Sequence, residues 1–138
     1  MNKLSFFLII CCFAMTFAER PDWYPKDELA VEAKCREENS ISPELMTKIW
    51  SSKIEDTPQV RKYVMCLGHN KNFYNSEIGF KADRLLVIMK ERANMDCKPG
   101  FVEGCAEEGK DIEPEDAMLF KIIRCVIVGG EENCKKAE

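Results

Sequence analysis

Residues 114–128, PEDAMLFKIIRCVIV, set the architecture of this chain. Apolar side chains surround the helix predicted here almost completely, and only Ala117, Lys121 and Arg124 form a narrow, less apolar edge. A helix that is apolar on most sides is buried within a domain. Gly129-Gly130 is expected to end it, and the tail that follows, EENCKKAE, is short and polar.

Five shorter helices are predicted before this one. Ser42-Pro43 and Thr57-Pro58 each place a capping hydroxyl before a proline, which is typical of a helix start. Neither the sustained alternation of a strand nor an Asn-Gly or Asp-Gly hairpin turn appears. The prediction is therefore an all-α chain. The first helix is predicted to begin after Asp27 and to end at about Asn39. The second and third begin after Ser42 and Thr57, and the third frays into Gly68-His69-Asn70. The other three helices cover about 82–93, 101–108 and 114–128.

The first eighteen residues have the pattern of a secretory signal peptide. Lys3 precedes an apolar run from Leu4 to Phe17, and Ala18 supplies a small residue at the cleavage point. The run is shorter than the roughly 20 residues needed to cross a bilayer, and no later stretch is long and uncharged enough. The mature chain is expected to be secreted and extracellular, as a single domain over 19–138 without stable membrane insertion.

The charge balance argues against two classes of partner. Once Lys3 leaves with the leader, 19 basic residues remain beside 24 acidic ones, a net charge near −5. Nucleic acid and anionic membrane both attract basic surfaces, so neither is expected as a partner.

Six cysteines remain in the mature chain, and an even number in a short exported protein predicts three disulfides. A zinc site is the disfavoured alternative, because the sequence has no CxxC pair and one histidine. The six are Cys35, Cys66, Cys97, Cys105, Cys125 and Cys134.

Catalysis is not expected. His69 is the sole imidazole, and no motif of a hydrolase or metalloprotease surrounds it. Paired cysteines leave no thiolate for chemistry, and the His-Asp pair and glycine-rich calcium loop of a secreted phospholipase A2 are missing. We predict no catalytic residue, no metal and no cofactor.

Two segments resemble a known family. RKYVMCLGHNKNFY (61–74) looks like the third-helix segment of the insect odorant-binding proteins, the pheromone-binding and general odorant-binding family. CAEEGKDIEPEDAMLFKIIRC (105–125) looks like their C-terminal segment. That family normally has six cysteines, with three residues between the second and third and eight between the fifth and sixth.

The cysteine spacing resembles that of the subgroup called minus-C odorant-binding proteins, which lacks the second and fifth cysteines. Cys66 matches the third cysteine and Cys125 the sixth, while Lys62 and Asp116 stand at the second and fifth positions. A second register would take Cys125 and Cys134 as the fifth and sixth, but it leaves too long a gap after the fourth.

The resemblance implies a compact six-helix, disulfide-stapled domain enclosing an apolar pocket, with the first cysteine bonded to the third and the fourth to the sixth. The two cysteines without a counterpart in the subgroup are expected to pair and tie the polar tail to the start of the fifth helix. The expected disulfides are Cys35–Cys66, Cys105–Cys125 and Cys97–Cys134.

Lys62 and Asp116 carry opposite charges where the family has a disulfide. One hypothesis is that they form a salt bridge, and the alternative is that both side chains lie in solvent. An exposed ion pair contributes about 0 to 1 kcal/mol, against roughly 2 to 4 kcal/mol for a disulfide. The third and sixth helices should therefore be clamped less firmly.

The resemblance implies a carrier that reversibly binds a small hydrophobic molecule, such as an odorant, a pheromone or a lipid-like ligand. A secreted interaction protein or inhibitor without a cavity is the alternative, and a receptor or a weak homodimer stays open as a further partner. Helical faces predict these lining residues: Ile49, Trp50, Val64, Leu86, Met89, Met118 and Ile122, with Tyr74 and Phe80 near an entrance.

Overall fold

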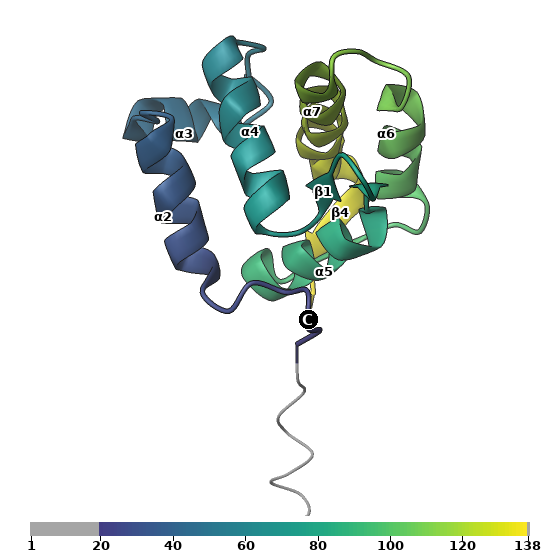
Figure 1. Cartoon of the computed structure of the whole chain (residues 1–138). Coiled ribbons are helices and arrows are strands. Elements are labelled where there is room, and N and C mark those ends of the chain that lie inside the picture. The colour runs from purple at the N-terminus through teal and green to yellow at the C-terminus, as the bar shows by residue number, and fades with distance from the viewer. Residues whose placement is uncertain (1–19, 138) are drawn as a thin grey trace, which may run out of the picture.

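The computed structural model describes residues 20–137 as six helices and two short antiparallel ribbons (Figure 1). The predicted signal peptide, residues 1–18, lies outside the described residues. The helices are α2 (Glu28–Glu38), α3 (Pro43–Ile49), α4 (Pro58–Asn70), α5 (Ala82–Ala93), α6 (Phe101–Gly109) and α7 (Glu115–Asn133). The ribbons pair β1 (Tyr74–Asn75) with β2 (Gly79–Phe80), and β3 (Met95–Cys97) with β4 (Cys134–Lys136).

The first three helices begin where their capping residues predicted. The side chains of Asp27, Ser42 and Thr57 each accept a hydrogen bond from the backbone N–H three residues ahead, at 3.0, 3.1 and 3.2 Å. Each bond satisfies one of the amide groups that the first helical turn leaves without a partner. The six-helix, all-α prediction is confirmed in this part of the chain.

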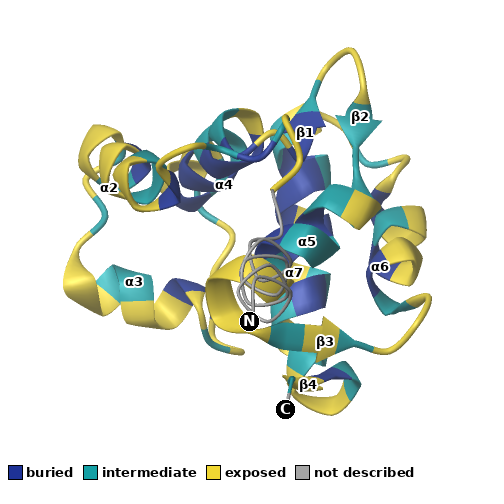
Figure 2. Cartoon of the chain, turned by 90° about the horizontal axis from the view of Figure 1, so that it is seen from below, coloured by how far each residue is buried: buried dark blue, intermediate teal, exposed yellow. Residues whose placement is uncertain are grey.

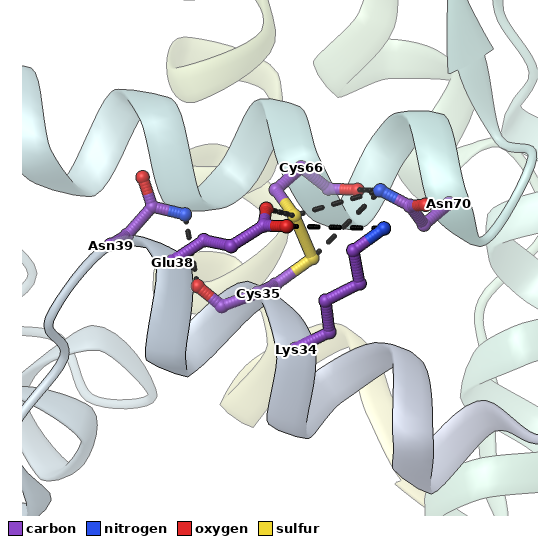
Figure 3. The surroundings of a disulfide bond; sticks show 6 residues. All are labelled: Lys34, Cys35, Glu38, Asn39, Cys66 and Asn70. Carbon is purple, nitrogen blue, oxygen red and sulfur yellow. Dashed lines mark hydrogen bonds and ion pairs between the residues drawn. A yellow bond between two sulfur atoms is a disulfide. The ribbon is translucent and has the colours of Figure 1, made fainter.

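The disulfide between Cys35 and Cys66 joins α2 to α4 (Figure 3). Beside it, the side-chain amide of Asn70 donates to the carbonyl oxygen of Cys66 at 2.8 Å. The backbone N–H of Lys71 donates to the carbonyl of Leu67 at 2.8 Å, so the helix continues to Asn70. The prediction that it frays into Gly68-His69-Asn70 is wrong.

The helix α7 also runs further than predicted, because Gly129-Gly130 lies within it and it ends at Asn133. A Cβ atom on Gly129 would stand 2.8 Å from Cε1 of Phe101, so glycine allows α6 and α7 to approach closely here. The side-chain amide of Asn133 donates to the Gly129 carbonyl at 2.8 Å. Packing and this bond outweigh the low helix propensity of the two glycines.

The ribbons were not predicted from the sequence. β1 and β2 contain two residues each, and β3 and β4 contain three each. Segments of this length are too short to show the alternating pattern by which strands are recognised. The β3–β4 ribbon places Cys97 opposite Cys134, and a disulfide joins the two.

The buried residues gather on the faces of α4 and α7 that meet in the middle of the molecule, whereas α2 and α3 are largely exposed (Figure 2). Leu119 is fully buried, and Val60 and Val64 of α4 are almost so. α7 also packs against α6, to which the Cys105–Cys125 disulfide ties it. The three disulfides therefore join the expected pairs, Cys35–Cys66, Cys97–Cys134 and Cys105–Cys125.

The salt-bridge hypothesis for Lys62 and Asp116 is wrong in its basic partner. Arg61 lies 3.7 Å from the Asp116 carboxylate and also donates to Asp56 from Nη2 at 2.8 Å. Successive residues of a helix point about 100° apart, and the position of α4 that faces Asp116 is Arg61. Lys62 is exposed. The hydrogen bond from Arg61 holds the pKa of Asp56 below its ordinary value.

We expect two glycines of α6 to respond oppositely to alanine. A Cβ on Gly109 would stand 2.6 Å from Cγ1 of Ile122 on α7, whereas a Cβ on Gly104 would meet nothing within 4 Å. Gly109→Ala should lower the free energy of unfolding by about 1–3 kcal/mol through overpacking. Gly104→Ala should raise it by about 0.5–1 kcal/mol through helix propensity. Denaturant titration of both variants measures the difference, and equal effects would contradict the close α6–α7 packing.

Candidate functional site

The larger of two cavities described here has a volume of about 770 Å³ and lies among α3, α4, α5, α7 and the β3–β4 ribbon. One face of each of three helices supplies most of its apolar wall. These faces follow the helical repeat of i, i+3 and i+4, and consist of Tyr63, Val64 and Leu67 on α4, Leu85, Ile88 and Met89 on α5, and Ile123, Val126 and Ile127 on α7.

One part of this cavity is charged. Lys71, the residue that caps the C-terminus of α4, is 7% exposed, and its Nζ lies 3.0 Å from Glu28 and 3.4 Å from Glu32. Arg92, in the last turn of α5, donates to Glu32 from Nε at 2.9 Å. The phenol of Tyr24 donates to Glu28 behind the cavity wall. We call Glu28, Glu32, Lys71 and Arg92 the ion cluster.

The ion cluster changes the acidity of its members in defined directions. Burial opposes ionisation of Glu32, but the hydrogen bond from Arg92 and the charge of Lys71 outweigh it, so the pKa of Glu32 lies below its ordinary value. Burial raises the pKa of Tyr63, which also lines the cavity, to about 12. No buried polar side-chain atom among residues 20–137 is without a hydrogen-bond partner, so the charged groups of the cluster are paired with one another.

Exposed residues at the end of α3 and in the C-terminal tail line the larger cavity, and we call this part its mouth. Trp50 is 56% exposed, and its indole N–H lies 3.0 Å from the sulfur of Met46. Lys135 and Lys136 of β4 are exposed and also line the cavity. The Cys97–Cys134 disulfide fixes β4 at this place, so the polar tail forms part of the wall.

A second cavity, of about 510 Å³, lies between the β1–β2 hairpin, α6 and α7. Glu103, Glu107 and Glu115 line it together with Lys110. Tyr74 is buried in its wall, and burial, followed by the Glu115 carboxylate, raises the pKa of the Tyr74 phenol. This cavity is therefore more polar in its lining than the larger one.

The predicted lining residues divide between the two cavities. Because α7 is apolar on most sides, its sequence does not reveal which side faces which cavity. Leu86 lines neither cavity and packs against the core instead. Those on the larger cavity are Ile49, Trp50, Val64 and Met89. Those on the smaller cavity are Tyr74, Phe80, Met118 and Ile122.

The ion cluster was missed in the sequence, although one signal was present. Glu28, Glu32 and Cys35 follow the spacing i, i+4, i+7 and therefore share a face of α2. Since Cys35 bonds to Cys66 on α4, this face meets α4 near its C-terminus. The sequence alone could have placed both carboxylates close to Lys71, but not Arg92.

Among residues 20–137 no three side chains of His, Cys, Asp or Glu lie close enough together to hold a metal ion. His69 is exposed, with its ring 5.8 Å from that of Tyr74. No helix within the described range is both long and apolar enough to cross a membrane.

Comparison with known proteins gives one match. The family model described as the PBP/GOBP family matches residues 24–128. No curated protein and no solved structure matches the chain. The matched range contains all six helix starts and most of the residues that line the larger cavity.

We expect the variant Glu32→Gln to destabilise the protein near neutral pH by about 1–3 kcal/mol, because Lys71 and Arg92 lose a shared negative charge. The pKa of Glu32 is lower in the folded state, so its stabilisation is present above the ordinary value of 4.5 and disappears as pH falls through the folded value. The difference between wild type and variant should therefore vanish in acid.

Thermal and denaturant unfolding over a pH series measure this difference. The matched control is Glu37→Gln, which changes an exposed carboxylate on the same helix and should alter stability by less than about 0.5 kcal/mol. A gap between wild type and Glu32→Gln that is constant with pH would show that charge is not the cause.

Proposed function

Since the chain belongs to the PBP/GOBP family, the insect odorant- and pheromone-binding proteins, we propose that it is an extracellular carrier that reversibly binds a small hydrophobic molecule such as an odorant, a pheromone or a lipid-like compound. Members of this family are secreted carriers of small hydrophobic ligands and not enzymes. The proposal concerns this chain's ligand and the cavity that receives it.

The larger cavity is the observation that supports the proposal. Its volume of about 770 Å³ lies within the range of about 300–1,000 Å³ that is usual for small-molecule sites. Apolar faces of three helices form its wall, and transfer of apolar ligand area out of water contributes about 25 cal/mol per Å². Binding of this kind forms no covalent bond, so it is reversible.

The smaller cavity is a less suitable place for a hydrophobic ligand. Three carboxylates and Lys110 line it, and Lys110 is paired with Glu107. An apolar molecule placed there would remove these charged groups from water without replacing their hydrogen bonds. The proposal therefore assigns the ligand to the larger cavity and treats Met118 and Ile122 as packing residues.

The remaining parts of the proposal come from the sequence. Residues 1–18 are removed on secretion, and residues 19–138 act as one ligand-binding domain. The minus-C assignment and a receptor or weak homodimer as further partner stay predictions.

Displacement of the apolar dye N-phenyl-1-naphthylamine tests the proposal. The mature, oxidised protein should bind the dye saturably, and a subset of long-chain alcohols, aldehydes and acids should displace it. Folded protein that binds neither dye nor ligand would favour the alternative, a secreted interaction protein or inhibitor without a ligand cavity.

A matched pair of methionines distinguishes the two cavities. Met89 lines the larger cavity and Met118 the smaller, and both are partly buried. Met89→Trp should fill the ligand space and raise the dissociation constant of the dye about tenfold or more. Met118→Trp should change it by less than about twofold. Circular dichroism of both variants verifies their folding, and the reverse order of effects would assign the ligand to the smaller cavity.

A further inference from the structure

The larger cavity differs in charge from the rest of the protein. Four cationic side chains line it against two carboxylates, whereas the whole chain has a net charge of −4. Glu28, which reaches Lys71 from outside the lining, still leaves the cations in excess by one. The lining charges are Lys71, Arg92, Lys135 and Lys136 against Glu32 and Glu131.

The ammonium group of Lys71 keeps a donor that the ion cluster does not use. An ammonium has three N–H groups, and the two carboxylates within reach of Nζ belong to Glu28 and Glu32 on α2. Lys71 is 7% exposed and also lines the cavity. With two carboxylate partners and three N–H groups, Lys71 has one N–H left for a ligand in the cavity that it lines.

Arg92 stands beside Lys71 with unused donors of its own. Its Nε and Nη2 donate to Glu32 at 2.9 and 3.3 Å, and a guanidinium has five N–H groups in all. Arg92 lines the cavity from the last turn of α5 and is half-exposed. Two cations therefore meet at the polar part of an otherwise apolar wall.

We infer that the ligand is an amphiphilic monocarboxylate, such as a free fatty acid, whose carboxylate lies against Lys71 and Arg92 while its tail occupies the apolar wall. The inference rests on the proposed function and narrows its ligand class. A carboxylate accepts charge-assisted hydrogen bonds, which are stronger than those of an alcohol or ester. Unused N–H groups of Lys71 and Arg92 supply the hydrogen bonds that an ionised head group needs when it leaves water. Because Glu28 and Glu32 offset the charges of these two residues, the excess positive charge of the lining comes from the lysines of β4.

The lysines of β4 supply the excess positive charge of the cavity lining at the mouth. Lys135 and Lys136 are exposed and line the opening. Positive charge at an entrance attracts anions and raises their rate of association. A carboxylate amphiphile thus meets cations first at the mouth and then at the ion cluster.

Competition among head groups on one tail tests the inference. Dodecanoic acid, 1-dodecanol and methyl dodecanoate are compared as competitors of N-phenyl-1-naphthylamine near neutral pH, where the acid is ionised. The acid should bind about tenfold tighter than the alcohol or the ester. Acetate, which has the head group but no tail, should not displace the dye.

A second pair of variants tests where the carboxylate of the ligand binds. Arg92 and Lys90 both lie in the last turn of α5, each has a carboxylate partner, and both side chains are 47% exposed, but only Arg92 lines the cavity. Arg92→Gln should weaken dodecanoic acid about fivefold to tenfold and leave the alcohol nearly unchanged. Lys90→Gln should change neither.

The double variant Lys135→Gln/Lys136→Gln provides a test that leaves the ion cluster intact, because both residues are exposed. It should weaken the acid by about twofold to threefold through lost attraction. Equal binding of acid and alcohol by wild type, or an acid preference that survives Arg92→Gln, would overturn the inference while leaving the carrier function in place. Failure of every amphiphile to displace the dye would instead overturn the proposed function itself.

Discussion

The apolar packing of α4 against α7 is the contact on which the rest of the fold depends. The disulfides clamp α2 to α4, α6 to α7, and β3 to β4, but none joins α4 to α7. Buried side chains such as Val64 and Leu119 therefore hold the two clamped halves together. The pair Arg61–Asp116 adds one ion pair at 3.7 Å, and because it is partly exposed it contributes little. Both cavities border α7, so their shape follows from how this helix is seated.

Much of this fold was predictable because its signals are local. A capping hydroxyl and a following proline act within one helical turn, so Ser42 and Thr57 mark helix starts reliably. The ends of α4 and α7 were missed because they depend on distant contacts. Gly129 remains helical since Phe101, 28 positions earlier in the chain, lies against it. The pairing of Asp116 with Arg61 was missed for a similar reason, since it depends on the rotation of α4 about its axis.

The candidate site was less predictable than the fold. A helical pattern shows which residues face inward, but in a helix that is apolar on most sides it does not show which of two cavities they reach. For this reason Val64 and Met118 were predicted to line one pocket, whereas in the structure they line different cavities. The ion cluster joins residues separated by 43 and 60 positions. Its members are charged residues, which sequence-based prediction places on the surface because isolated charges are rarely buried. Mutual pairing makes their burial acceptable.

The position of β4 has a kinetic consequence. Cys134 is fixed by its disulfide, but the chain beyond it is held by the short ribbon and by hydrogen bonds between Asn94 and Ala137 at 2.8 and 3.0 Å. Segments held by few contacts open locally at a free energy well below that of global unfolding. This ribbon borders the larger cavity, so its local opening would expose the cavity while every helix stays in place. Opening of this ribbon and unfolding of the helices are therefore separate events, and a change in the β4 segment would alter access to the cavity without altering the helical fold.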